Sequence, residues 1–242
     1  MGKSDRWERR VEEFVLGQIG DSPRRVLEVG CGEGELALAL ARAGHSVTAI
    51  DPRAPEGPIF RRVRIEEFSD PRRFDHVVAS LSLHHVEDLG VALGNIARSL
   101  RAGGSLVVVE FAWDLIDEAT AQWALERLPA APTSERPSWL ERCCREWACG
   151  GERESHDHGD QGDHAEAHLA EWAGEESLHD SRQVRAELER CFVERRFEWV
   201  PYLYPDLGDG VSEANESAAI ESGTINATAF RYVGVRRALI EP

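Results

Sequence analysis

The sequence predicts an α/β fold in which a mostly parallel β-sheet lies between two layers of helices, a three-layer sandwich. Short apolar segments alternate with helix-forming segments from residue 7 to residue 111, which is typical of parallel sheets with crossover helices. A glycine-rich turn joins the first apolar segment to the helix that follows it. Apolar alternation returns near the C-terminus and predicts two further strands for the same sheet.

The apolar segments have the length of buried strands. They cover residues 25–29, 45–50, 61–65, 74–80 and 105–111. Apolar residues at helical spacing predict helices over 7–19, 35–43 and 91–100. Ala102, Gly103 and Gly104 predict a turn before the fifth strand. Because strands and helices alternate, neighbouring strands should run parallel and be joined by right-handed crossovers.

The alternation stops after residue 112, so we expect three parts. Residues 1–112 form the core, and residues 113–190 form a polar, mostly helical insertion that is longer than an ordinary crossover. Residues 191–242 contain two strands, over 192–204 and 225–236, with a short helix over 213–221 between them. Six of the seven tryptophans lie beyond residue 112. They indicate aromatic packing in the insertion, although some could line a substrate pocket.

Charge and composition exclude several classes of partner. The 242 residues carry 28 basic and 44 acidic side chains, a net charge of −16, of which −14 falls on residues 113–242. Such a surface repels phosphate backbones, so we expect neither nucleic-acid nor membrane binding. Five cysteines make a disulfide framework improbable. With no apolar signal core at the N-terminus, these features predict a cytoplasmic protein.

The glycine turn has the spacing Gly30-x-Gly32-x-Gly34, directly before a helix. Glycine lets a ligand approach the backbone closely, and a helix N-terminus offers free N–H groups. The dinucleotide fingerprint would need glycine at position 35, where the chain has Glu35. Glu28 precedes the turn by two residues, and its carboxylate suits an ammonium or sulfonium better than a pyrophosphate.

Asp51 ends the second predicted strand, 17 residues after Gly34. In this topology the end of the second strand meets a ribose, and a carboxylate can accept hydrogen bonds from both hydroxyls. The simpler alternative is that Asp51 caps the turn before Pro52.

Together these segments resemble the successive motifs of class I S-adenosylmethionine-dependent methyltransferases. The matching segments are Val26-Leu-Glu-Val-Gly-Cys-Gly-Glu-Gly34, Ile50-Asp51, Phe74-Asp75, Ser80-Leu-Ser-Leu-His-His-Val86 and Leu100-Arg-Ala-Gly-Gly104. They occur in the family's order and spacing over residues 20–112, and the last two strands fit its Rossmann-like seven-stranded sheet. The segment Leu83–Val86 is similar to the branch that methylates quinones and other small molecules.

The resemblance implies a methyltransferase that uses S-adenosyl-L-methionine, releases S-adenosyl-L-homocysteine and acts on an oxygen, nitrogen or carbon of a small-molecule acceptor. It implies that Glu28 lies near the methionine amino group, that Asp51 holds the ribose and that the insertion covers the acceptor as a lid. The full set of expected cofactor contacts is Glu28, Gly30, Cys31, Gly32, Gly34, Asp51, Pro52, Ile65, Glu66, Ser80, Leu81 and His85. Ile65 and Glu66 would flank the adenine, and Ser80, Leu81 and His85 the sulfonium. Arg64 stands where the family often has a carboxylate for the adenine.

Two histidines, His84 and His85, follow the fourth strand at the sheet edge where ligands collect. Either could act as a general base, or both could simply pack. Taken as an extended segment, the pair points in opposite directions, and we expect His85 to face the acceptor. Other chemistry also stays possible: a cyclase or isomerase that uses the bound cofactor as a fixed charge, or a silent binding protein, as a monomer or homodimer.

A second group of histidines and cysteines lies in the insertion. Its members are Cys143, Cys144, Cys149, His156, His158, His164 and His168. His164 and His168 are four residues apart and could share a helix face. No Cys-x-x-Cys pair accompanies them, so a solvated loop without a metal is the simpler interpretation.

Overall fold

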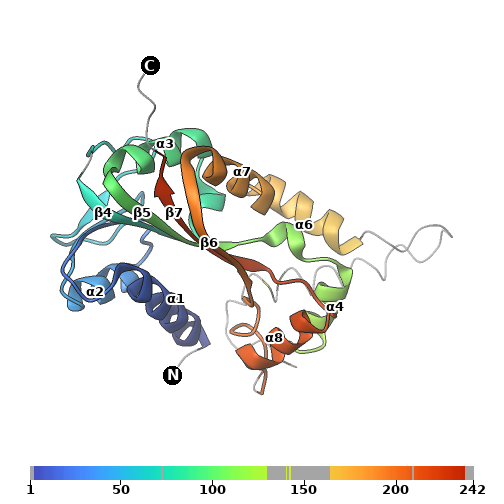
Figure 1. Cartoon of the computed structure of the whole chain (residues 1–242). Helices are drawn as coiled ribbons and strands as arrows, with labels where there is room; N and C mark the ends of the chain where they lie inside the picture. Colours follow the sequence, from blue (N-terminus) through green and yellow to red (C-terminus); the bar gives the residue numbers. More distant parts are fainter. Residues whose placement is uncertain are drawn as a thin grey trace. The chain divides into compact units, whose positions relative to one another are not determined.

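A computed structural model describes residues 3–71, 73–129, 140, 142, 164–208 and 210–237 (Figure 1). The chain divides into two units, which we describe separately. The sheet unit comprises Glu8–Phe111, Leu178–Glu198 and Phe230–Pro242, and the helical unit comprises Met1–Trp7, Ala112–Ser177 and Trp199–Ala229. Residues 178–198 therefore group with the sheet, and residues 199–229 group with the helices of the insertion.

One seven-stranded sheet runs through the molecule in the order β3-β2-β1-β4-β5-β7-β6. Its strands are β1 (Arg25–Val29), β2 (Ser46–Asp51), β3 (Phe60–Arg62), β4 (Phe74–Ser80), β5 (Leu100–Phe111), β6 (Phe192–Val200) and β7 (Ala229–Arg236). The five strands from β3 to β5 pair in parallel. The predicted α/β class and mostly parallel seven-stranded sheet are confirmed.

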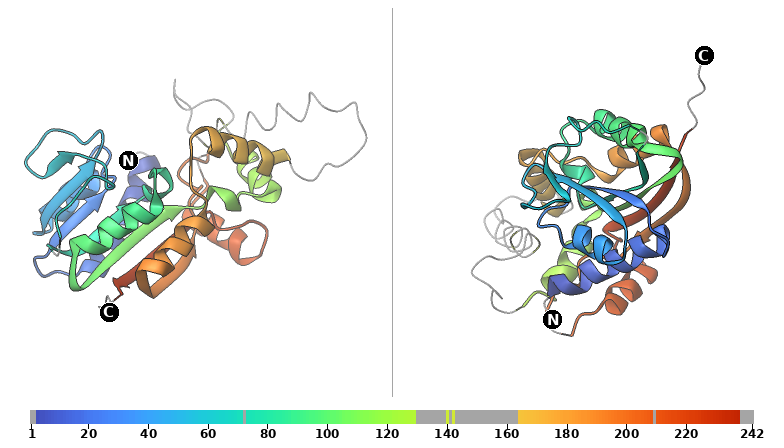
Figure 2. Two further views of the ribbon diagram at one scale, coloured as in Figure 1. Left: turned by 90° about the horizontal axis from the view of Figure 1, so that it is seen from above. Right: turned by 90° about the vertical axis from the view of Figure 1, so that its left-hand side faces the viewer.

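Helices cover both faces of the sheet (Figure 1). One face carries α3 (Leu89–Ser99) and α7 (Ser181–Cys191), which lie side by side in the view of Figure 2. The other face carries α1 (Lys3–Ile19) and α2 (Glu35–Arg42). Leu27 and Val77 from the sheet, Ile96 from α3 and Val184 from α7 belong to one fully buried apolar cluster. This cluster joins the sheet to the layer of α3 and α7, because burying apolar side chains is the main driving force of folding.

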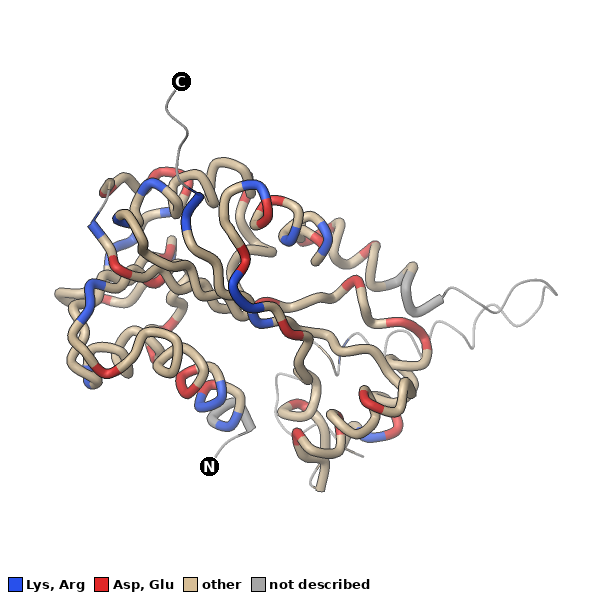
Figure 3. Tube along the Cα trace, in the orientation of Figure 1, with Lys and Arg blue, Asp and Glu red and all other residues tan. Residues whose placement is uncertain are grey.

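The helical unit contains η2 (Trp113–Leu115), α4 (Glu118–Leu125), α6 (His164–Glu175) and α8 (Glu213–Glu221). Its apolar cluster includes Trp123, Leu203 and Ile225. Acidic side chains outnumber basic ones on α4 and α8 (Figure 3). The buried Glu216 of α8 accepts the backbone N–H groups of Tyr202, Leu203 and Tyr204 at 2.7 to 3.0 Å, so one carboxylate holds the turn after β6.

Two predictions about strand boundaries, in β3 and β5, are wrong. The third strand starts at Phe60 and ends at Arg62, whereas we expected 61–65. The Phe60 ring packs where a side chain at Gly34 would lie, and Val63 to Glu66 leave the sheet to line a cavity. The expected turn at Ala102–Gly104 lies within β5 as an irregularity, because Phe74 pairs with Leu100 and His76 with Ser105.

The late strands are shorter than predicted. The structure ends β6 at Val200 and begins β7 at Ala229, whereas we expected 192–204 and 225–236. Residues 201–204 form the turn that Glu216 holds, and Ile225 belongs to the apolar cluster of the helical unit. The short helix over 213–221 has the predicted bounds.

Candidate functional site

A cavity of about 430 Å³ opens in the sheet unit at the carboxyl ends of β1, β2 and β4. Eight of the twelve predicted cofactor contacts line it, namely Gly30, Gly32, Asp51, Pro52, Ile65, Glu66, Leu81 and His85. Its volume falls in the range of pockets for small molecules, and its place at the carboxyl edge is where open α/β sheets bind ligands.

The remaining predicted contacts, Glu28, Cys31, Gly34 and Ser80, do not line the cavity. Sequence reasoning missed other residues that do: Val29, Ile50, Arg53, Val63, Arg64, Ser82, Val86 and Glu87. Most of these residues are next to predicted contacts in the chain. They could have been found by extending each motif by one or two residues. Ser82 takes the place expected for Ser80, because β4 continues through Ser80 and the chain turns into the cavity only afterwards.

The glycines of the turn have different tasks. The N–H groups of Gly30 and Cys31 donate to the carbonyl of Ile50 at 2.8 and 3.1 Å, which ties the turn to β2. Gly32 has φ +50°, and a Cβ there would meet no heavy atom of the described residues within 4 Å, so its side of the turn is open among them. Gly34 has φ +90°, and a Cβ there would lie 2.6 Å from the Phe60 ring. Gly34 therefore serves packing, while Gly32 leaves room for a ligand.

Cys31 lies in the turn but is buried. Burial first, and then the nearby Glu28 and Asp51 carboxylates, raise the pKa of its thiol to about 12. The thiol therefore stays protonated, and Cys31 is a small filler of the turn and not a nucleophile.

Asp51 bonds two backbone groups. Its Oδ2 accepts the N–H of Gly32 at 3.2 Å, and its Oδ1 accepts the N–H of Arg53 at 2.7 Å. The second bond is the turn cap that the simpler interpretation expected. Each carboxylate oxygen has two lone pairs, so both oxygens retain capacity to accept a hydroxyl of a ligand. The cap and the ligand role are therefore compatible.

Glu28 is a buried carboxyl group with an unused oxygen. Its side chain is 3% exposed, and its Oε2 has no hydrogen-bond partner within the described part of the chain. Burial, and then the charges of Glu35 and Asp51, raise its pKa to about 8. A buried polar atom without a partner is costly, and a cationic ligand group beside it would remove that cost.

The rim of the cavity is held by residues that follow β3. Arg64 pairs with Glu87 at 2.8 Å, and Glu66 Oε1 accepts the N–H of Glu87 at 2.8 Å. Asn95 donates from below to the carbonyls of Ile65 and Glu66, both at 2.8 Å. Arg64, which departs from the family pattern, therefore contributes an ion pair at the rim.

The segment after β4 brings His85 to the cavity through a strained turn. Leu81 has φ +49°, a left-handed conformation that is unfavourable for a leucine, and such strain clusters at functional sites. Ser82 Oγ donates to the carbonyl of Val29 at 3.0 Å. The next residues form the 3₁₀ helix η1 (Leu83–His85), so our expectation of an extended segment was wrong. His85 lines the cavity, whereas His84 is buried beneath it.

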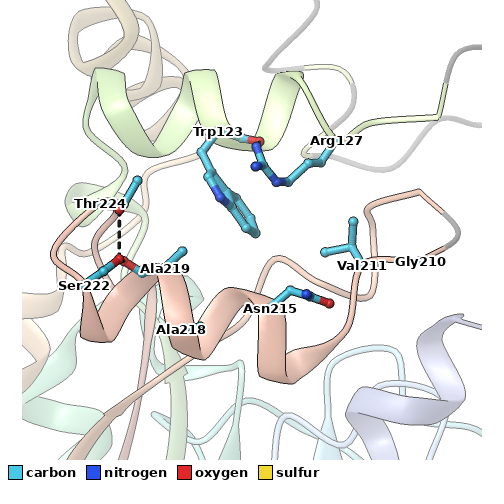
Figure 4. A pocket seen from close by; sticks show the side chains of 9 residues that line it. All are labelled: Trp123, Arg127, Gly210, Val211, Asn215, Ala218, Ala219, Ser222 and Thr224. Carbon is cyan, nitrogen blue, oxygen red and sulfur yellow. Dashed lines mark hydrogen bonds between the residues drawn. The ribbon is translucent and has the colours of Figure 1, made fainter.

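A second cavity, of about 500 Å³, lies in the helical unit between α4 and α8 (Figure 4). Several of its polar side chains already bond one another. Ser222 Oγ and Thr224 Oγ1 are 2.8 Å apart, and Arg127 donates to the carbonyl of Trp123 at 3.0 Å with its guanidinium over the indole ring. These groups are committed to internal contacts, so we assign this cavity no ligand.

In the described part of the chain, no group of three or more His, Cys, Asp and Glu side chains is arranged to hold a metal ion. The predicted cysteine- and histidine-rich group, residues 143–168, has side chains outside the described residues. No described helix is long and apolar enough to cross a bilayer.

Comparison with known proteins links this geometry to a family. The family model named "Methyltransferase domain" matches residues 3–147. An uncharacterized methyltransferase of Mycobacterium tuberculosis is 39% identical over 101 residues, which cover 36% of this chain and 50% of that protein. A ubiquinone biosynthesis O-methyltransferase of Bradyrhizobium sp. is 31% identical over 137 residues, 51% of each protein. The match thus spans about half the length of these relatives.

Solved structures agree at the level of the fold. An S-adenosylmethionine dependent methyltransferase from Mesorhizobium loti aligns over 94% of this chain and 98% of its own, with a TM-score of 0.56 and 17% identity. The family model spans more than half of the chain, including the glycine turn, Asp51 and the segment after β4. This match and the shared fold show that the chain belongs to the methyltransferase domain family.

Proposed function

We propose that this protein transfers the methyl group of S-adenosyl-L-methionine to a small-molecule acceptor and releases S-adenosyl-L-homocysteine. The observation that carries the proposal is the oxygen of Glu28 that has no partner among the described residues and is buried next to the glycine turn, near Asp51. A cofactor with an ammonium group at one end and a ribose in the middle would offer a hydrogen-bond donor to each of these two carboxyl groups. A dinucleotide has no ammonium group for Glu28 and would bring its pyrophosphate toward the same acidic side chains, which disfavours it.

Each part of the cofactor has a fitting group in the chain. Asp51 and Ile65 line the cavity and would receive the ribose hydroxyls and the adenine ring. Glu28, buried near Asp51, would receive the ammonium. Gly32 leaves open space beside the turn. When bound, the cofactor supplies a methyl group on a positively charged sulfur.

The chain's own residues would contribute alignment and a proton acceptor. Methyl transfer gains most of its rate from holding the acceptor atom in line with the methyl group and from excluding water. For a hydroxyl acceptor, His85 would take the proton, since it is the imidazole that lines the cavity. An amine that is already neutral needs this step less.

The acceptor class follows from the relatives and stays part of the proposal. One relative is named for ubiquinone biosynthesis, which favours a phenolic or quinone-like acceptor, with a natural product as the wider class. The lid role of residues 113–190, a cytoplasmic location and a monomeric or homodimeric state remain predictions from the sequence.

The test has two stages. Calorimetry with S-adenosylmethionine, S-adenosylhomocysteine and NAD should show micromolar binding of the first two and none of the third. The protein is then incubated with cofactor carrying a deuterated methyl group and with fractions of small metabolites, including phenols and quinols. A product that gains the labelled methyl, together with released S-adenosylhomocysteine, supports the proposal.

The other classes give different outcomes. A rearranged product without label would indicate the cyclase or isomerase alternative. Binding of the cofactor without release of S-adenosylhomocysteine in any fraction would indicate a binding protein. Binding of NAD in place of S-adenosylmethionine would overturn the cofactor assignment.

A further inference from the structure

The turn that carries His85 rests on one buried carboxylate, that of Glu110 in β5. Glu110 is 0% exposed and accepts three hydrogen bonds. Its Oε2 accepts the N–H of Leu83 at 2.8 Å, and its Oε1 accepts the N–H of Phe111 at 2.9 Å and contacts Nδ1 of His84. A fully buried carboxylate is costly unless donors surround it. Two of its three donors come from η1, so this residue binds the sheet to the turn.

His84 fills the space between Glu110 and His85. Its ring is buried, and its centroid lies 4.1 Å from that of the His85 ring, with 39° between the planes. The Phe111 ring also packs against the His84 ring, edge-on, with 6.0 Å between the ring centroids. Both oxygens of Glu110 already accept backbone N–H groups, so we expect Nδ1 of His84 to be the donor in their contact. This contact holds the His84 ring in place beside the ring of His85.

A third histidine holds the same turn from the side of α7. The backbone N–H of His179 donates to the carbonyl of His84 at 2.9 Å, and its Nε2 bonds the carbonyl of Val86 at 2.8 Å. The backbone on both sides of His85 is thus fastened. One attachment comes from β5 and the other from the residue before the N-cap of α7.

We infer that Glu110 and His84 are a positioning pair that sets the orientation of the His85 imidazole in the cavity. This inference rests on the proposed function, in which His85 accepts a proton from the acceptor. A base must be held close to its productive geometry, and a shift of about 1 Å can cost about 100-fold in rate. Neither member of the pair was a candidate for this role from sequence: Glu110 lies 25 residues beyond His85, on another strand.

Three variants separate the contributions. Glu110→Gln keeps the size of the side chain but turns an amide N–H₂ toward one of the three donors. His84→Asn keeps a donor at the place of Nδ1 but removes the ring beside His85. His84→Ala removes both. The matched control is Glu216→Gln, which alters an equally buried carboxylate with three backbone donors in the helical unit.

The first readout needs no acceptor. Proton–nitrogen NMR of the full chain, assigned with His85→Asn, reports the ring signals of His84 and His85. Glu110→Gln should remove the slowly exchanging, far-downfield Nδ1 proton of His84 and shift the ring signals of His85. His84→Asn should shift the His85 signals as well. Glu216→Gln should leave both rings unchanged, even though it destabilises the protein.

The second readout uses the acceptor found in the labelling experiment. Glu110→Gln and His84→Ala should lower kcat about 10- to 100-fold. The Kd of S-adenosylhomocysteine should stay within about threefold of wild type, because neither side chain lines the cavity. If the two residues had a merely structural role, the variants would be less stable, but they would not combine a lowered kcat with an unchanged Kd.

The inference is overturned if the His85 signals are the same in Glu110→Gln, His84→Asn and wild type. It is equally overturned if kcat in all three variants stays within twofold of wild type. Should Glu110→Gln fail to fold, His84→Asn carries the same comparison. Should no acceptor be methylated, the NMR result still decides the positioning, so the proposed function can fail separately.

Discussion

The backbone N–H of Gly32 donates to the carboxylate of Asp51 over 3.2 Å, which joins the glycine turn to the end of β2. The two residues are 19 positions apart in the chain and belong to separate motifs. Because the same carboxylate also bonds the N–H of Arg53, Asp51 supports the shape of the cavity as well as any ligand inside it. Substitutions at Asp51 should therefore affect both the turn and the cofactor.

For Asp51, we expect Asp51→Ala to weaken S-adenosylmethionine binding by about 1.5–3 kcal/mol, because charge-assisted hydrogen bonds to the ribose are lost. Asp51→Asn keeps an acceptor for Arg53 and should lose less. Calorimetry measures the affinity, and Glu56→Gln, an exposed carboxylate nearby, is the control. Unchanged affinity in Asp51→Ala would show that this residue is only a cap.

The glycines of the turn should respond in opposite ways. Gly34→Ala places a methyl group 2.6 Å from the Phe60 ring at φ +90°, so it should destabilise folding by about 1–3 kcal/mol. Gly32→Ala meets no atom within 4 Å, so it should cost about 1 kcal/mol through its backbone conformation alone while strongly weakening S-adenosylhomocysteine binding. Urea unfolding and calorimetry on both variants make the comparison. Equal losses of affinity and stability in the two would contradict it.

Glu28 should make the stability of the ligand-free protein depend on pH. Its pKa is raised to about 8 in the folded protein, so folding takes up a proton between the unfolded value of 4.5 and about 8. The contribution to stability is fully present below pH 4.5 and falls as pH rises to about 8. Glu28→Gln should flatten this part of the profile by a few kcal/mol and be more stable than wild type above pH 8.

The same carboxyl group should release a proton when the cofactor binds. At pH 7 Glu28 is protonated in the free protein, and an ammonium beside it favours the carboxylate. Calorimetry in two buffers of different ionisation enthalpy measures the released proton. It should be absent in Glu28→Gln and present in Glu33→Gln, an exposed carboxylate of the same turn. Proton release that persists in Glu28→Gln would assign it to another group.

His85 should matter most for a hydroxyl acceptor. We expect His85→Ala to lower kcat by about 10²–10⁴ and to remove a limb of the pH–rate profile that rises where histidine loses its proton. With an amine acceptor the loss should be milder. Measuring both proteins on one acceptor across pH decides the role. A rising limb shared by wild type and His85→Ala would mean that another group titrates.

Local patterns explain how much of the fold was predictable. The alternation of apolar runs and helices, and a glycine turn between β1 and α2, are properties of neighbouring residues, and they predicted the parallel sheet. Eight residues of the cavity wall were predicted through the resemblance to methyltransferase motifs, which are themselves short local segments. Errors fell where a distant contact decides the local structure. Phe60 begins β3 because Gly34, 26 residues earlier, has no side chain. β5 continues past Gly103 because β4 pairs with it on both sides of the irregularity, at Leu100 and again from Ser105 onward.

The sequence by itself determined the fold class, the glycine turn and the place of Asp51, because residue order and spacing specify backbone geometry over a few residues. Only the tertiary structure decided which histidine lines the cavity, that Ser82 replaces Ser80 at its wall, and that one oxygen of Glu28 has no partner among the described residues. Burial and hydrogen-bond partners depend on segments that meet only after folding. Glu110 contacts His84 from β5, the strand next to β4, and no local pattern around either residue predicts that contact.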